Sequence, residues 1–278
     1  MKKLGLALLM SLLMSASYGQ YGVIVDYKKD SWNNVKNNKL HVVYEEEGAS
    51  SYDKALTAAL SGNWSFSEIE FITYEEYEEL QKIETNFFMI SVDFTSTQVG
   101  RYNENLSYIY IIKGNKKGAK KGDISHFYKL ASIQSGDISR ETYLPVLIKH
   151  LNKSIEEVVA SEIKSLGDNT KKLNVNRSKI KDNPLYLLNS DLNDRITSEQ
   201  DIKEHYKGEV KIISREELSQ KIKDSEDINI LFCARSTTKS YLHIYSAKTG
   251  EEYYNAFNMV TNKYPAGLIS FHLKKWNK

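Results

Sequence analysis

The sequence predicts an α/β protein built from two tandem units, each with a small mixed sheet. The segment EIEFITYEEYEELQKI (Glu68 to Ile83) returns as EVKIISREELSQKI (Glu209 to Ile222). The segments that follow also correspond, because NFFMISV is matched by NILFCAR and SYIYI by SYLHI. Each copy alternates short apolar runs with helical patterns, which is typical of strand-helix-strand units. The two halves are therefore predicted to be an internal repeat of one unit.

The N-terminal residues 1–19 have the three-part pattern of a secretory signal peptide. Lys2 and Lys3 precede an apolar run from Leu4 to Met14, and small residues precede Gln20. The apolar run is shorter than the roughly 20 residues of a membrane anchor. We therefore expect cleavage before Gln20, export to the periplasm or the extracellular space, and a mature protein without a transmembrane segment. Residues 20–38 are expected to form a flexible lead-in with one added strand.

The first unit is predicted to span residues 39–165. Its expected order is a strand from Leu40, a helix that Gly62 ends, a strand, a second helix, two strands and a long helix. The second helix should begin with a capping box, in which Thr73 and Glu76 satisfy each other's backbone amides. The predicted ranges of the later elements are Ile69 to Ile72, Tyr74 to Ile83, Phe87 to Phe94, Tyr108 to Ile112 and Thr142 to Ile163, with Pro145 in the first turn of the last helix.

Residues 166–184 are polar and basic and contain Gly, Asn and Pro, so they are predicted to be a linker. The second unit, residues 185–278, should repeat the order β-α-β-α-β-β-α. Its two strand-helix-strand steps favour parallel strands, and its last two strands favour an antiparallel hairpin. The predicted ranges are Leu185 to Leu188, Ser198 to Tyr206 with a cap at Thr197, Val210 to Ile213, Arg215 to Ile222, Ile230 to Ala234, Tyr241 to Tyr245 and a closing run from Gly267 to Trp276.

This order of elements is also that of the thioredoxin fold, but the redox chemistry of that fold is not expected. The chain has one cysteine, Cys233, and no Cys-x-x-Cys pair. Cys233 lies between apolar residues in NILFCAR, where a cysteine usually packs as a small hydrophobic side chain.

The second unit resembles the amino-terminal domain of TolB and the CsgG-like periplasmic domains. The resemblance rests on the strand that enters a capped helix (EVKIISREELSQKI), the apolar strand NILFCAR, and the strand that ends in a turn, YLHIYSAKTGEE. It implies envelope assembly or protein docking without catalysis. No propeller repeats follow the α/β part, and no transmembrane-strand pattern of a secretion pore is present.

Two groups of residues are candidates for binding a partner. A lysine-rich, glycine-spaced segment can attract anionic lipid, lipopolysaccharide or an acidic protein, although a charged solvated turn explains it as well. Tyrosines at alternate positions of the paired strands line one face of each hairpin, in a core or at an interface. These candidate residues are Lys113, Lys116, Lys117, Lys120, Lys121, Tyr108, Tyr110, Tyr241 and Tyr245.

The remaining patterns predict no catalytic, cofactor or metal site. The six histidines have no zinc-type spacing, and Ser125 and His126 in the loop GDISH lack the setting of a hydrolytic triad. Removal of Lys2 and Lys3 with the signal peptide leaves 36 basic and 36 acidic side chains, so nucleic-acid binding is not expected.

We therefore expect an exported, non-catalytic docking or structural component of the bacterial cell envelope, whose partner is another envelope protein. The alternative is a small-molecule or glycan binder, or a hydrolase, that uses a cleft between the two units. A pocket at the junction with two or more carboxylates or a His-acid pair would favour the alternative, and a filled junction with an exposed aromatic strand face would favour docking.

Overall fold

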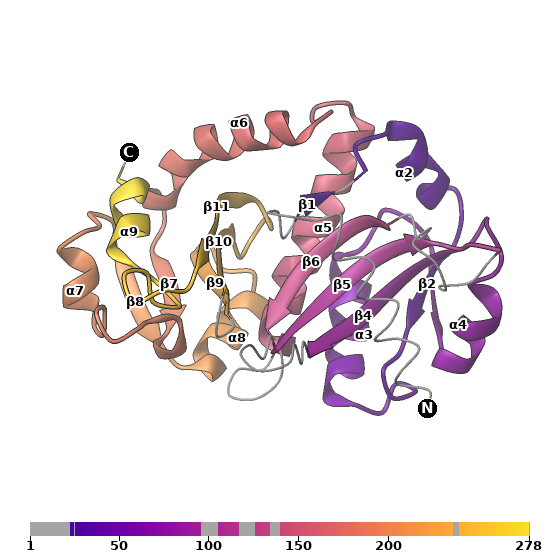
Figure 1. Cartoon of the computed structure of the whole chain (residues 1–278), viewed down its shortest axis with the longest axis horizontal. Helices are drawn as coiled ribbons and strands as arrows, with labels where there is room; N and C mark the ends of the chain where they lie inside the picture. The colour runs from indigo at the N-terminus through magenta and orange to yellow at the C-terminus, as the bar shows by residue number, and fades with distance from the viewer. Residues whose placement is uncertain are drawn as a thin grey trace.

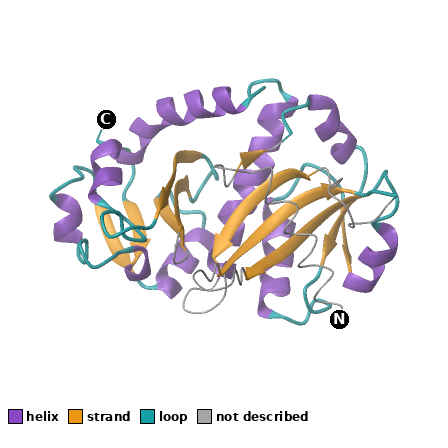
Figure 2. Ribbon diagram, in the orientation of Figure 1, coloured by secondary structure: helices purple, strands orange, loops and turns teal. Residues whose placement is uncertain are grey.

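The computed structural model describes residues 23–24, 26–95, 105–116, 126–133, 140–235 and 239–277. The expected signal peptide lies outside these residues. Two mixed sheets with helices on their faces stand side by side, as Figures 1 and 2 show. The α/β class with two small mixed sheets is thus confirmed.

The first sheet has the strand order β1-β6-β5-β4-β2-β3. Strand β2 pairs with β3 and β4 in parallel, and β4, β5 and β6 form an antiparallel meander that β1 extends. The strands are Val23–Ile24 (β1), Leu40–Val43 (β2), Ile69–Ile72 (β3), Phe87–Thr95 (β4), Asn105–Lys113 (β5) and His126–Ile133 (β6). The helices are Lys29–Lys36 (α2), Ser51–Asn63 (α3), Tyr74–Leu80 (α4), the 3-10 helix Arg140–Tyr143 (η2) and Leu144–Val159 (α5).

The second sheet has the order β11-β10-β9-β7-β8, with β7 parallel to both of its neighbours. Its strands are Leu185–Leu188 (β7), Val210–Ile213 (β8), Asn229–Arg235 (β9), Lys239–Ser246 (β10) and Glu252–Met259 (β11). The helical elements are Leu166–Asn176 (α6), Arg177–Lys181 (η3), Asn189–Asp191 (η4), Glu199–Lys203 (α7), Arg215–Lys223 (α8) and Ser270–Trp276 (α9).

The two sheets share one strand order when β1 is set aside. Strands β6-β5-β4-β2-β3 take the same places as β11-β10-β9-β7-β8. Each unit has three antiparallel strands where the sequence predicted two. The missed strands β6 and β11 have mixed polar and apolar sequences, and both complete a meander by pairing with the strand before them.

The helix caps follow the sequence with one shift. Thr73 and Glu76 form the expected capping box, and Ser214 accepts a hydrogen bond from the backbone amide of Glu217. The cap predicted at Thr197 is at Ser198, one residue later. The carboxylate of Asp201 explains the shift, because it accepts hydrogen bonds from the amides of both Thr197 and Ser198.

Two segments expected to be irregular are helical. The lead-in contains α2, whose Trp32 and Val35 are fully buried. Trp32 also donates a hydrogen bond from its indole nitrogen to the backbone oxygen of Asp26 at 2.6 Å. The linker forms α6 and η3, which run along the upper edge of the molecule in Figure 1. The serine at position 165 caps α6 by accepting from the amide of Asp168.

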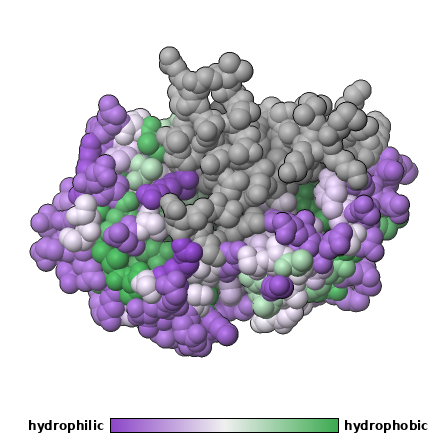
Figure 3. Space-filling view, turned by 90° about the horizontal axis from the view of Figure 1, so that it is seen from below, coloured by the Kyte–Doolittle hydropathy of each residue, from purple (hydrophilic) through white to green (hydrophobic). Residues whose placement is uncertain are grey.

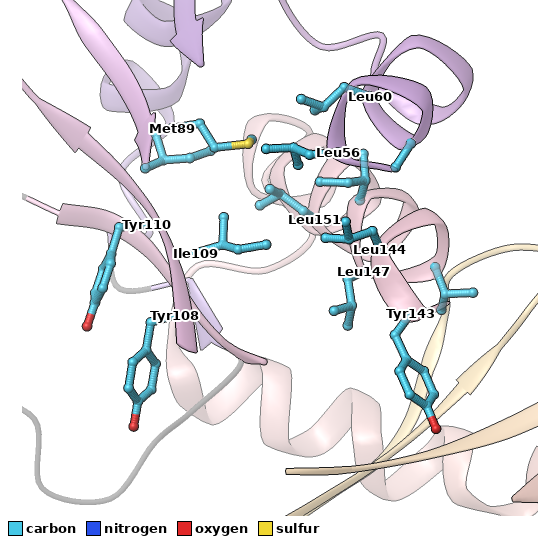
Figure 4. Close-up of a cluster of buried hydrophobic side chains, with 14 of the residues drawn as sticks. Leu56, Leu60, Met89, Tyr108, Ile109, Tyr110, Tyr143, Leu144, Leu147 and Leu151 are labelled. Atoms are coloured by element: carbon cyan, nitrogen blue, oxygen red, sulfur yellow. The ribbon is translucent and has the colours of Figure 1, made fainter. Parts of the chain in front are cut away.

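Helix α5 is the element that the two sheets share. Its buried residues include Leu144, Leu147 and Leu151, which face α3 and the first sheet (Figure 4). His150, on the same helix, packs against Tyr245 of the second sheet, with ring centroids 5.0 Å apart. One hydrophobic core therefore continues from the first unit into one face of the second sheet, and a smaller core covers the opposite face.

Among the described residues, none of the helices combines the length and the apolar character that a membrane crossing requires.

Candidate functional site

The four candidate tyrosines do not form an exposed docking face. Tyr108, Tyr110, Tyr241 and Tyr245 are 3%, 6%, 1% and 0% exposed. Tyr108 and Tyr110 lie side by side on the face of the first sheet opposite Ile109, as Figure 4 shows. Tyr245 lies in the junction between the units, where His150 and Phe232 contact its ring. The tyrosines of each hairpin do share one face of their strand, as predicted, but that face is buried in both units.

The lysine-rich segment is described only in part. Lys113 is half-buried at the end of β5, and Lys116 is exposed and forms an ion pair with Glu84 at 3.4 Å. Lys117, Lys120 and Lys121 lie outside the described residues. An exposed ion pair of this kind contributes little to stability, so Lys116 remains available to an acidic or anionic partner.

The junction between the units is filled where the turn between β10 and β11 meets α5. Gly250 has φ +68°, and a Cβ at this position would lie 2.5 Å from Cβ of Lys149 and 2.6 Å from the backbone nitrogen of His150. The backbone oxygen of Gly250 contacts Nδ1 of His150 at 3.2 Å. Only glycine fits this backbone conformation and this close approach.

A polar network holds the same turn from three sides. Glu251 forms ion pairs with Lys153 of α5 and Lys179 of η3, and it accepts a hydrogen bond from the side chain of Asn176 in α6. Lys149 donates hydrogen bonds to the backbone oxygen of Ala247 and to the hydroxyl of Ser225. These contacts tie the two units into one body.

A histidine and a glutamate form a buried pair beside this turn. Nδ1 of His243 and Oε1 of Glu252 are 2.6 Å apart, and the two side chains are 0% and 4% exposed. Burial lowers the pKa of the neighbouring His150 to about 4, against the opposing effect of Glu252, so this histidine is neutral near pH 7. The junction thus contains a His-acid pair, but the pair is enclosed in the protein.

A second polar group lies at the carboxyl end of the second sheet. Asp191, which follows β7, is 0% exposed and accepts a hydrogen bond from the amide of Leu188 at 2.8 Å. Burial raises the pKa of Asp191 to about 7, while the Leu188 bond and the charge of Arg235 oppose this rise. Arg235 donates to the backbone oxygen of Leu192 at 3.1 Å.

Cys233 lies next to this group but is not a reactive thiolate. It is 2% exposed, and burial together with the charge of Asp191 raises its pKa to about 12. Its sulfur lies 3.9 Å from the hydroxyl of Ser240, which also accepts a hydrogen bond from the amide of Gly267. The prediction that Cys233 packs as a small hydrophobic side chain agrees with this environment.

Most of the large exposed apolar side chains belong to the last part of the second unit. Seven large hydrophobic side chains are exposed among the described residues, and four of them lie between positions 257 and 271. Figure 3 shows hydrophobic side chains gathered at the end of the molecule that carries the second sheet. We call Phe257, Met259, Tyr264 and Phe271 the C-terminal apolar patch; they are 38%, 53%, 38% and 51% exposed. Phe257 stacks on Tyr241 on one face of β11, whereas α9, which carries Phe271, packs through His272 on the other face. The patch therefore surrounds the edge strand β11 of the second sheet and does not lie on one face of it.

Sequence reasoning missed both Asp191 and this patch. The acidic residue directly after the buried strand LYLL was a usable signal, because ligand-binding groups often follow such strands. The patch gave no comparable signal, since its residues belong to a strand, a turn and a helix.

Within the described part of the chain, no group of three or more His, Cys, Asp or Glu side chains is arranged to hold a metal ion. Comparisons with protein-family models, with curated proteins and with solved structures find no match to this chain.

Proposed function

We propose that the protein is an exported, non-catalytic component of the bacterial cell envelope that docks or supports another envelope protein. The C-terminal apolar patch carries this proposal. Large apolar side chains that are exposed around one edge of a sheet are candidates for contact with a partner protein. The proposed contact differs from the one expected from the sequence, because the patch replaces the buried tyrosine faces.

The filled junction also favours the docking function over a ligand-binding cleft between the two units. The core and the Glu251 network join both units through α5, so a partner would meet the two units together. Lys113 and Lys116 would add electrostatic attraction, which governs association rate more than affinity. The resemblance to the TolB amino-terminal and CsgG-like domains stays a prediction that agrees with this role.

The test is capture of envelope proteins by the purified mature protein at low and high salt. We expect Met259→Asp combined with Phe271→Asp to abolish capture of a specific partner that wild type retains at high salt. Val175→Asp is the matched control, because Val175 is 72% exposed and lies on α6, outside the patch.

Two outcomes would contradict the proposal. Equal capture by wild type and the double variant would exclude the patch, and no retained protein at either salt would exclude docking in this form. If the variant with both Lys113→Gln and Lys116→Gln loses capture only at low salt, the two lysines attract the partner electrostatically. Export is tested separately by the N-terminal sequence of the protein recovered from the envelope, which we expect to begin at Gln20.

A further inference from the structure

The second sheet has a switch point between β7 and β9, which are adjacent and parallel. From β7 the chain passes through α7 to β8 on one side, and from β8 it returns through α8 to β9 on the other side. Ile202 of α7 belongs to the smaller core, whereas Leu218 of α8 belongs to the core shared with α5. In open α/β sheets, ligands bind in the crevice that opens at the carboxyl ends of two such strands.

Polar residues from both units meet at this point. Asp191 follows β7, and Arg215 begins α8 directly after β8. Tyr143 comes from η2 of the first unit, which packs against α8. Burial raises the pKa of its hydroxyl, the charge of Asp191 raises it further, and Arg215 opposes the rise. Its ring packs edge-on against Phe232, with centroids 5.1 Å apart. Figure 4 shows the Tyr143 side chain pointing away from Leu144 and Leu147, toward the second sheet.

Two buried polar atoms at this point have no hydrogen-bond partner within the described residues. They are Oδ1 of Asp191 and the hydroxyl oxygen of Tyr143, in side chains that are 0% and 1% exposed. Burial without a partner is unfavourable for such atoms, because they lose their hydrogen bonds to water. A bound molecule would supply the missing partners.

At the matching end of the first sheet, a buried carboxylate finds protein partners for both of its oxygens. Asp53 is also 0% exposed, and its carboxylate holds the loop that follows β2. It accepts hydrogen bonds from the amides of Glu45, Glu46 and Gly48 at 2.9, 2.9 and 3.1 Å. Both oxygens of Asp53 are therefore satisfied by the protein itself, whereas only one oxygen of Asp191 is.

The charges at the switch point of the second sheet favour an anionic ligand. Arg215 is half-buried and has no ion pair or hydrogen bond with its side chain in the described part of the chain. Arg235 is exposed, and Nη1 of its guanidinium donates to the backbone oxygen of Leu192. The exposed Glu216 and Glu217 on α8 point to a ligand of limited charge. Arginine guanidinium groups bind carboxylates and phosphates through paired hydrogen bonds.

We propose that the carboxyl end of the second sheet binds a small molecule that carries a carboxylate or phosphate group next to a hydroxyl. Arg215 and Arg235 hold the oxyanion. Asp191 Oδ1 and the Tyr143 hydroxyl bond the neighbouring hydroxyl of the ligand. The site needs both units, since Tyr143 belongs to the first and the other residues to the second.

The test measures binding to the full mature protein by calorimetry, in a buffer free of carboxylate and phosphate. Three probes separate the contributions: inorganic phosphate for the oxyanion alone, glycerol 3-phosphate for phosphate with a hydroxyl, and lactate for carboxylate with a hydroxyl. We expect wild type to bind at least one hydroxyl-bearing probe more tightly than phosphate. Preference for glycerol 3-phosphate or for lactate then identifies the oxyanion.

Two substitutions test the residues. Arg215→Gln should weaken binding of that probe tenfold or more, and Tyr143→Phe should remove its advantage over phosphate. Arg195→Gln is the matched control, because Arg195 also donates to backbone oxygens of the second unit, those of Lys263 and Asn262. Circular dichroism confirms that each variant is folded, and Arg235→Gln replaces Arg215→Gln if the latter does not fold.

The proposal is overturned if wild type binds none of the probes at millimolar concentration, or if Arg215→Gln binds as wild type does. Because these measurements use no protein partner, their result does not depend on the docking proposal.

Discussion

Replacement of Asp191 with asparagine is expected to stabilise the protein at about pH 8 and to change its stability little at about pH 4. The carboxyl group is 0% exposed, and its pKa is raised from 3.8 to about 7, chiefly by burial. The folded protein therefore holds this proton more tightly than the unfolded chain does. Below pH 3.8, Asp191 is protonated in both states and its ionisation does not affect the free energy of unfolding. As the pH rises from 3.8 to about 7, the free energy of unfolding falls, and above about pH 7 it falls no further through this group.

The size of the effect follows from the shift in pKa. A rise of about three units corresponds to about 4 kcal/mol. Asparagine has nearly the same shape and stays neutral, and its side-chain oxygen can still accept the Leu188 hydrogen bond. The groups that face Asp191 do not titrate in this range: the pKa values of Tyr143 and Cys233 are raised by burial, and Arg235 stays charged.

Urea unfolding of wild type and Asp191→Asn at a series of pH values between about 4 and 8 measures this difference. Changes at other titrating groups are common to both proteins and cancel. Asp53→Asn is the control with the opposite sign, because Asp53 uses both oxygens and an amide nitrogen would meet backbone donors. The reasoning is refuted if Asp191→Asn destabilises the protein at about pH 8, or if its effect does not vary with pH.

Three further predictions concern the junction and the cores. Gly250→Ala should destabilise the protein by about 2 kcal/mol or more, since the new Cβ would collide with α5. Gly62→Ala is the control: it lies inside α3 with open space around it and should stabilise the protein by about 0.5–1 kcal/mol. Urea unfolding measures both changes. Burial lowers the pKa of His272 from 6.5 to about 4, so wild type loses about 3 kcal/mol of unfolding free energy through this group as the pH falls from 6.5 to about 4. His272→Gln should not show this loss, and urea unfolding at each pH measures the difference. Leu147→Ala should cost about 2–5 kcal/mol and lower one shared transition in tryptophan fluorescence; two separate transitions would contradict a shared core.

Helices and strands were predictable where the signal lies within a few consecutive residues. The observed bounds of β3, β7 and β8 are those predicted, since each is a short run of β-branched or aliphatic residues. The capping box at Thr73 was predictable because it is a contact between residues three apart. The strands β6 and β11 were not, because their pairing depends on the strand before them rather than on their own pattern.

The functional surfaces depended on tertiary packing, which single-sequence patterns do not carry. Tyrosines at alternate positions predict a shared face, but only the position of α5 decides that Tyr245 is buried. The surroundings of Asp191 are likewise set by packing, since its charge raises the pKa of Tyr143, a residue that is distant in the sequence and belongs to the other unit. Ion pairs such as Glu251 with Lys153 and Lys179 join three elements and leave no periodic signal.

The contrast between Asp53 and Asp191 connects the fold to the proposed ligand site. Both carboxylates are fully buried at the carboxyl end of a central parallel strand, in sheets with one strand order. In the first unit, three backbone amides close this end of the sheet, so the site is structural. At the matching end of the second sheet, one oxygen of Asp191 and the hydroxyl of Tyr143 from the first unit have no hydrogen-bond partner among the described residues. A stabilising effect of Asp191→Asn, together with loss of binding in Tyr143→Phe, would show that this end of the second sheet gives up stability in order to bind a ligand.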